Sequence, residues 1–137
     1  MKTIMTALAL TTVAIVALAA EHAVAPAIEA ADQSVVNGVV SADMVVAAEN
    51  GWMVVHRTDA EMKPSPFVGY APLRTGDNID VAAILTEEVA SGDMLMLMVH
   101  AEEGGMMTGG FEYALGAKED GPIRIDGELV MAVITAE

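Results

Sequence analysis

The 137-residue chain contains no cysteine, and it has only six basic residues against twenty acidic ones. Without cysteine there are no disulfide bonds, so a folded domain must be held together by its core alone. A lipid-anchored lipoprotein and a blue-copper site are excluded for the same reason, because each needs a cysteine. The formal net charge of −14 disfavours nucleic acid and anionic membrane surfaces as partners, since both are repelled by a polyanion.

Sequence signatures of common enzymes are also missing. The chain has no G-x-S-x-G elbow, no H-E-x-x-H pair and no phosphate-binding P-loop. The adjacent acids Glu87-Glu88 and Glu102-Glu103 fall beside predicted turns, where we expect them to be solvated. Neighbours on a strand face opposite sides, so neither pair converges on one site. We therefore expect a protein that is not an enzyme.

The N-terminus has the three parts of a secretory signal peptide. One positive charge at Lys2 precedes an apolar run over residues 4–20, which ends in small residues. Ala17-Leu18-Ala19 fits the Ala-x-Ala cleavage pattern, so residues 1–19 are the predicted signal peptide. The sequence Ala23-Val24-Ala25 is a less favourable alternative because proline follows it. Cleavage would leave an exported, periplasmic or cell-surface chain with no stable membrane insertion.

An uncleaved membrane anchor is the alternative to a cleaved signal. The apolar run over residues 4–20 is 17 residues long and rich in alanine and threonine, which is at the short limit for a membrane span. Removing residues 1–19 takes away one basic residue and no acid, so the formal charge changes from −14 to −15.

The remaining chain divides into a leader and one domain. Residues 20–33 are rich in alanine and lack two-residue alternation, which predicts a flexible leader. From residue 34, short β-branched and apolar runs alternate with glycine, asparagine, aspartate and proline, and no helical period is sustained. Residues 34–137 are therefore predicted to be all-β, an immunoglobulin-like Greek-key β-sandwich of seven or eight short strands.

Turn signals place these strands. Asn50-Gly51 is a strong hairpin signal between strands predicted at 43–48 and 52–57. The turn signals Asp120-Gly121-Pro122 and Asp126-Gly127 are predicted to bracket a short hairpin arm. Further strands are predicted at 67–71, 79–85, 94–100, 111–115 and 129–135.

The segment 94–99 has six consecutive apolar side chains, so it is predicted to be the most buried strand, between two neighbours. Two-residue alternation separates its side chains into two rows. We assign Leu95, Leu97 and Val99 to the core face. The other face carries the methionines and ends at His100, and it must be covered by another part of the chain or by a partner.

Several short segments resemble one family. They are Gly51-Trp52-Met53-Val54-Val55-His56, Val68-Gly69, Val99-His100-Ala101-Glu102, Gly110-Phe111-Glu112-Tyr113 and Asp120-Gly121-Pro122-Ile123. As a set, from about residue 32 onward, they resemble uncharacterised immunoglobulin-like β-sandwich domains of exported and surface proteins in archaea and bacteria. Met106-Met107 departs from the Gly- and acid-containing turn usual in that family. The resemblance implies the sandwich fold, and the family has no assigned function.

The alternation also places copper-type ligands on common faces. Met98 and His100 share one face of their strand, and His56 lies on one face of the strand at 52–57. Thioether and imidazole groups are ligands of copper, so these three residues are a candidate metal site. Alternatively, the methionines are adaptable core fillers and the histidines are hydrogen-bonded. The copper interpretation requires that His56 and His100 converge.

The predicted cleavage creates a second candidate copper site. It would expose Ala20-Glu21-His22, whose amine, backbone amides and imidazole can surround Cu(II) or Ni(II) in a square plane. This hypothesis depends on the position of cleavage.

A calcium site is a third candidate. Acidic side chains could gather at one end of the sandwich, namely Glu102, Glu103, Glu112 and Asp120. Calcium needs six or more oxygen ligands, and no EF-hand spacing is present, which favours a solvated acidic face.

The sequence thus leaves two functions open. The first is a structural or interaction module of the cell envelope that contacts another protein or a polysaccharide. The second is a periplasmic copper-binding protein that uses His22, His56, His100 and Met98.

The signal-peptide prediction is tested at the N-terminus of the exported protein. We expect mass analysis to give Ala20 as the first residue, because Ala17 and Ala19 satisfy the peptidase's need for small side chains. A membrane-bound product that retains residues 1–19 would contradict cleavage and favour the anchor.

Overall fold

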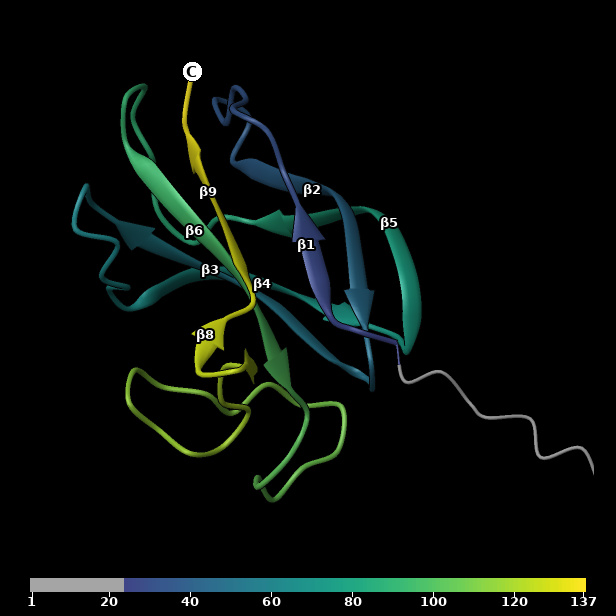
Figure 1. The fold of residues 1–137 in the computed structure, drawn as a ribbon. Helices are drawn as coiled ribbons and strands as arrows, with labels where there is room; N and C mark the ends of the chain where they lie inside the picture. Colours follow the sequence, from purple (N-terminus) through teal and green to yellow (C-terminus); the bar gives the residue numbers. More distant parts are fainter. Residues whose placement is uncertain (1–23) are drawn as a thin grey trace, which may run out of the picture.

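Two antiparallel sheets pack face to face in the computed structural model, which describes residues 24–137 (Figure 1). The first sheet has the order β1-β2-β5, with β1 at Ala27–Glu29, β2 at Val39–Ala47 and β5 at Gly76–Ile84. The second has the order β4-β3-β6-β9, with β4 at Phe67–Leu73, β3 at Gly51–Thr58, β6 at Met94–Ala101 and β9 at Met131–Thr135. The predicted all-β class is confirmed.

A short hairpin arm is present in the predicted region, but Asp126-Gly127 forms its turn and not one of its ends. This turn joins β7 (Arg124–Ile125) to β8 (Glu128–Leu129), which form a separate two-stranded sheet. Asp126 has φ 51° and Gly127 has φ 85°. Positive φ at both central residues is what a tight hairpin turn requires, and it explains the Asp-Gly pair. Among residues 24–137, no helix has the length and apolar character needed to cross a membrane.

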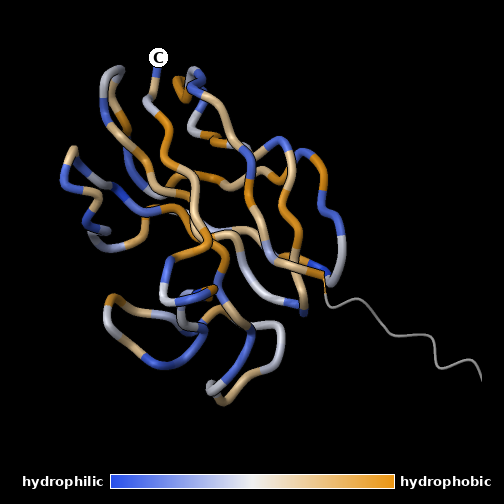
Figure 2. Tube along the Cα trace, in the orientation of Figure 1, coloured by the Kyte–Doolittle hydropathy of each residue, from blue (hydrophilic) through white to orange (hydrophobic). Residues whose placement is uncertain are grey.

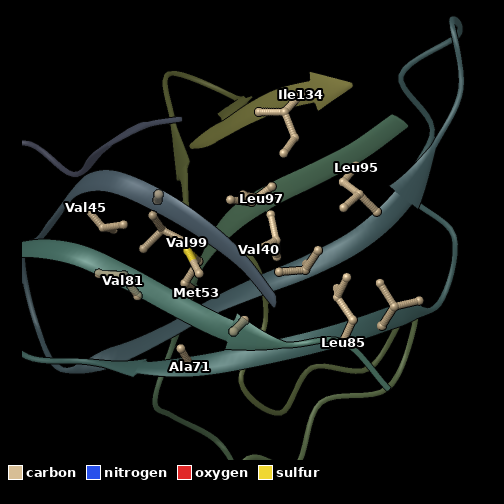
Figure 3. Packing of buried hydrophobic residues seen from close by; sticks show 14 of the residues in the cluster. Val40, Val45, Met53, Ala71, Val81, Leu85, Leu95, Leu97, Val99 and Ile134 are labelled. Carbon is tan, nitrogen blue, oxygen red and sulfur yellow. The ribbon is translucent and has the colours of Figure 1, made fainter. Parts of the chain in front are cut away.

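The hydrophobic core lies between the two large sheets (Figure 3). Small β-branched residues of β2 and β5, such as Val40, Val45 and Val81, meet larger side chains of β3 and β6, such as Met53 and Leu97. Hydrophobic stretches run along the strands of both sheets, and hydrophilic residues mark many of the turns (Figure 2). This alternation of apolar runs and polar turns is the pattern that predicted the strands.

Strand β6 occupies the interior position that its sequence predicts. It lies between β3 and β9, and every residue from Leu95 to His100 is buried. Leu95, Leu97 and Val99 belong to the core between the sheets, whereas Met96 and Met98 are buried outside that core. The assignment of the two faces is therefore confirmed. Strand β3 is buried to the same degree over its first six residues.

The connection at Asn50-Gly51 is not the predicted hairpin. It leads from β2 in one sheet to β3 in the other, and the two strands do not pair. A turn signal specifies that the chain reverses, but it does not specify which strand becomes the partner. The glycine has a different role, because a Cβ at position 51 would overlap the carbonyl oxygen of His100. Gly51 thus allows β3 and β6 to approach closely.

The ordered domain begins earlier than residue 34. Within the segment predicted as a flexible leader, β1 pairs with β2, and Ile28 packs against the core. The side chain of Gln33 holds the end of this segment, since its Nε2 donates to the carbonyl oxygen of Ser41 at 2.8 Å and its Oε1 accepts from the Ser41 amide at 2.8 Å. These long-range contacts order a segment whose local pattern is not that of a strand. The predicted signal peptide and His22 lie outside the described residues.

The predicted strand at 111–115 is a loop in the structure. The amide of Glu112 donates to Oδ2 of Asp120 at 2.8 Å. A carboxylate therefore supplies the acceptor that a neighbouring strand would otherwise supply, and the segment remains irregular.

The two faces of β6 allow a test of core packing. Truncating Leu97, which is fully buried, to alanine should lower the free energy of unfolding by about 2–5 kcal/mol. Ile84 is 77% exposed on a strand, so Ile84→Ala should cost well under ~1 kcal/mol. Urea denaturation of both variants measures the difference. Equal losses would contradict the placement of Leu97 in the core.

Candidate functional site

Loop 102–123 covers the outer face of β3 and β6, the face turned away from the first sheet. Met96 and Met98 of β6 and Val54 of β3 are buried on this face without belonging to the core between the sheets. The loop begins where β6 ends and returns beside it, because His100 and Pro122 form a bridge and the amide of Ile123 donates to the carbonyl oxygen of Val99 at 2.9 Å. Its return leads into the β7–β8 arm (Figure 1). The cover that the sequence requires for the second face of β6 is thus this loop.

All five aromatic residues of the chain gather between this loop and the sheet. Phe111 lies at the centre of this aromatic layer, with its ring centre 4.3 Å from that of Tyr70 and 5.1 Å from that of Phe67. Trp52 and Tyr113 complete the layer at 5.4 and 6.1 Å from Phe111. Tilted and edge-on pairs at these distances are favourable, so the aromatic layer fixes the loop on the sheet.

His56 and His100 converge beneath the aromatic layer. They come from β3 and β6, each is completely buried, and their ring centres lie 5.7 Å apart with the ring planes 25° from parallel. In the register of these strands His56 is opposite Met96, Val54 is opposite Met98 and Trp52 is opposite His100. The histidines therefore approach each other diagonally, across the Val54–Met98 pair. Tyr113 stands nearly perpendicular to both, 4.6 Å from His100 and 5.9 Å from His56.

Each imidazole is fixed by one backbone carbonyl. Nδ1 of His56 donates to the carbonyl oxygen of Ser65 at 2.6 Å, and Nδ1 of His100 donates to that of Asp120 at 2.6 Å. A carbonyl oxygen only accepts, so Nδ1 carries the hydrogen on both rings. The other nitrogen, Nε2, has no hydrogen-bond partner on either ring and is buried. In a neutral imidazole with this tautomer, Nε2 holds a lone pair.

Burial keeps both histidines neutral. Desolvation lowers the pKa of His100 to about 4, against the opposing effect of its hydrogen bond to Asp120, and the nearby His56 lowers it further. The pKa of His56 is also lowered by desolvation, and its hydrogen bond to Ser65 acts in the opposite direction. Both rings therefore present an unprotonated nitrogen at neutral pH.

Asp120 connects the histidines to the loop. Its carboxylate accepts from the amide of Glu103 at 3.1 Å and from that of Glu112 at 2.8 Å, and its own amide donates to the carbonyl oxygen of Glu103 at 2.9 Å. The same residue provides the carbonyl for His100 and adopts φ 46°, which is unusual for a residue other than glycine. One buried residue thus holds two points of the loop and one imidazole.

Three of the four acidic residues proposed for calcium, Glu102, Glu112 and Asp120, accept hydrogen bonds from backbone amides instead. Oε1 of Glu102 accepts from Gly109 at 3.0 Å, and Oε2 of Glu112 accepts from Met107 at 2.9 Å. Across residues 24–137, no three side chains of histidine, cysteine, aspartate or glutamate come together as a metal-binding group. Glu87, one of the acidic residues expected to be solvated, forms an ion pair with Arg57 at 2.5 Å at the other end of the sheet.

A second feature is an open groove between β4 and β5, the facing edge strands of the two large sheets. The strands approach closely at one end, where a Cβ on Gly69 would lie 2.8 Å from the carbonyl oxygen of Ile84. Residues 74 and 75 join them at the other end. Between these points two adjoining hollows of about 380 and 560 Å³ share Ala71, Pro72 and Ala82 as lining residues.

The structure thus brings together three of the four sequence-predicted metal residues, His56, His100 and Met98, on one face, and the fourth lies outside the described part. Sequence reasoning missed the contacts that Tyr113, Asp120 and the Ser65 carbonyl make with the histidines, because these contacts join segments far apart in the chain. It also missed the groove, which depends on β4 and β5 belonging to different sheets. The one available signal was the presence of two aromatic residues, Phe111 and Tyr113, close together in the segment after β6.

A family model described as a domain of unknown function, DUF7282, matches residues 26–137. No curated protein and no solved structure matches the chain. The match begins just before β1 and includes both large sheets, the loop and the aromatic layer. The chain belongs to this family.

The lowered pKa of His100 predicts a pH dependence of stability. Between pH 6.5, the ordinary value in the unfolded chain, and about pH 4, the unfolded chain binds a proton on His100 that the folded chain does not. The stability is therefore complete above pH 6.5 and is lost as the pH falls, by about 2 kcal/mol at pH 5. Urea denaturation gives the free energy of unfolding at pH 7.5 and at pH 5.0. The difference between these two values should be smaller in His100→Gln than in the parent protein, by about this amount. An unchanged difference in a folded variant would contradict the burial of the neutral ring.

Proposed function

We propose that this member of the DUF7282 family is a non-catalytic, exported module of the cell envelope that binds another envelope protein. Its localisation follows from the N-terminal signal peptide proposed from the sequence. Its binding surface is the groove between β4 and β5, and the observation that carries this proposal is the set of exposed apolar side chains along the groove. Tyr70 is 44% exposed, Ile79 62% and Ile84 77%.

Large apolar side chains that line a groove on both walls are unusual on a soluble surface, and they are typical of contact sites. Tyr70 stands on the β4 wall, and Ile79 and Ile84 stand on the β5 wall. Both walls are edge strands, which have backbone groups free for pairing. An extended segment of a partner protein fits such a groove, since it can add as a strand while its side chains enter the hollows.

The charge of the chain selects among partners. The formal net charge is −14, and Asp77 lies on the groove wall beside Arg74. A partner segment with apolar side chains and a net positive charge is attracted to this surface, whereas an acidic one is repelled. A polysaccharide without charge lacks this attraction. Crosslinking to carbohydrate is therefore the alternative result of the photo-crosslinking experiment.

The strand order supports an immunoglobulin-like relation between the sheets. In sequence order, the first, second and fifth strands form one sheet, and the third, sixth and last strands form the other with β4 at its edge. We infer from this order an immunoglobulin-type sandwich in which the fourth strand has joined the second sheet. Domains of this architecture are used widely as contact modules on cell surfaces, which agrees with the proposed role.

The groove is tested by photo-crosslinking in the native cell envelope. A crosslinking amino acid placed at Ile84 should give one discrete adduct with a protein, because this side chain borders the groove and is exposed. The matched control is Val36, an apolar residue that is 91% exposed in the turn before β2 and does not line the groove. Introducing Ile79→Lys should weaken the adduct from Ile84, since it places a charge in the apolar contact.

Three outcomes would contradict the proposal. They are the absence of a protein adduct at Ile84, the same adducts at Val36, and an adduct that Ile79→Lys leaves unchanged. A product that contains carbohydrate and no second protein would identify a polysaccharide as the ligand.

A further inference from the structure

Two buried imidazole nitrogens lack partners beneath the aromatic layer. Nε2 of His56 and Nε2 of His100 are enclosed, and neither has a hydrogen-bond partner in the described structure. A buried acceptor without a donor lowers the stability of a fold, so such groups are rare unless a ligand uses them. Both rings are completely buried, and they come from the two central strands of the larger sheet. The scaffold that holds them is therefore rigid.

The hydrogen bonds at Nδ1 are those that prepare a histidine for a metal. A ligating imidazole commonly donates its other N–H to a backbone carbonyl, which fixes the tautomer and the orientation of the ring. Ser65 serves His56 in this way and Asp120 serves His100, each at 2.6 Å. A metal–nitrogen bond is about 2 Å long, so two imidazoles that share one ion have ring centres about 6 Å apart or less. The observed separation of 5.7 Å meets this condition.

The strand register places one methionine, Met98, in the row between those of the two histidines. Met98 is two residues from His100 on β6, and its opposite residue, Val54, is two residues from His56 on β3. Met98 is 2% exposed and lies outside the core between the sheets, on the same face as the histidines. Met96 shares that face but is opposite His56, at the end of the pair away from His100.

The donor set selects the ion. Zinc favours four ligands from cysteine, histidine and carboxylates, whereas residues 24–137 contain no group of three such side chains. Calcium and magnesium need several oxygen ligands. Thioether and neutral imidazole ligands suit Cu(I), a soft ion with a single charge. The low charge matters, because no carboxylate is in this group to neutralise a divalent ion.

We propose that His56 and His100 bind one Cu(I) ion through their Nε2 atoms, with the sulfur of Met98 as the third ligand, in the water-excluded space beneath the aromatic layer. Loop 102–123 must open for the ion to enter, and Asp120 ties this opening to the imidazole of His100. None of the three proposed ligands lines the groove between β4 and β5, so either proposal can fail alone.

The test is competition for Cu(I) between the purified protein and the chromophoric chelator bicinchoninate under a reducing atmosphere. The background variant carries His22→Ala, so that an N-terminal copper site is excluded from the measurement. We expect the protein to withdraw one equivalent of copper. His56→Gln and His100→Gln should each weaken the affinity for Cu(I) about 100-fold or more, because each variant lacks one of the two imidazole ligands.

Two variants distinguish the sulfur ligand from its neighbour. Met98→Leu keeps the volume of the side chain and removes the thioether, so the affinity should fall about tenfold. Met96→Leu is the matched control on the same strand face and should leave the affinity unchanged. X-ray absorption of the copper complex should show nitrogen and sulfur ligands, with the sulfur contribution lost only in Met98→Leu.

Folding of each variant is checked by circular dichroism before titration. The proposal is overturned if the folded background protein withdraws no copper from bicinchoninate. It is equally overturned if His56→Gln and His100→Gln both fold and retain the parent affinity for Cu(I). If only one of these variants folds, retention of the parent affinity by that variant overturns the proposal. An unchanged affinity and an unchanged sulfur signal in Met98→Leu would remove Met98 from the ligand set. The proposed three-ligand site would then be wrong.

Discussion

The structure depends on covering both faces of its two central strands. Strands β3 and β6 are apolar on each side, and the packing of two sheets covers only the side that faces the core. The other side would be exposed apolar surface if loop 102–123 did not lie over it. Burial of apolar area is the main favourable term in folding, and the chain has no disulfide to compensate for its loss. The loop is thus a third layer of the domain, even though it has no regular structure.

This third layer explains the distribution of the aromatic residues. The core between the sheets contains valine, alanine, leucine, isoleucine and methionine, whereas all five aromatic side chains lie under or beside the loop. An irregular loop cannot use a strand ladder for its backbone groups, so it is fixed by large side chains and by the carboxylates of Glu102, Glu112 and Asp120. The cost of this solution is the burial of two imidazoles. Their neutral state, and the unused nitrogen on each, follow from the same dry environment.

The sequence predicts what depends on local pattern. The alternation in β6 indicates its two faces, and Asp126-Gly127 indicates a tight turn, because both follow from the stereochemistry of a few adjacent residues. The partner of each strand is not local. Asn50-Gly51 predicts a reversal but not the crossing to the second sheet, and the alanine-rich segment gives no sign that β1 will pair with β2. For the candidate site, periodicity places His56 and His100 on strand faces. Only the register of β3 with β6 brings them to the same place, since it sets their diagonal approach across Met98.

The central claim is that the loop keeps two neutral imidazoles dry, each with its hydrogen on Nδ1 and a free lone pair on Nε2. Long-range proton–nitrogen NMR spectra of the histidine side chains test this most directly, because they distinguish the two neutral tautomers from the charged ring. At pH 5.5 we expect His100 to show a protonated Nδ1 and an unprotonated Nε2, and to remain neutral down to about pH 4. At pH 7 we expect the same neutral tautomer for His56, whose pKa is also lowered by burial. A His100 ring that is charged at pH 5.5, or either ring with its hydrogen on Nε2, would contradict the account.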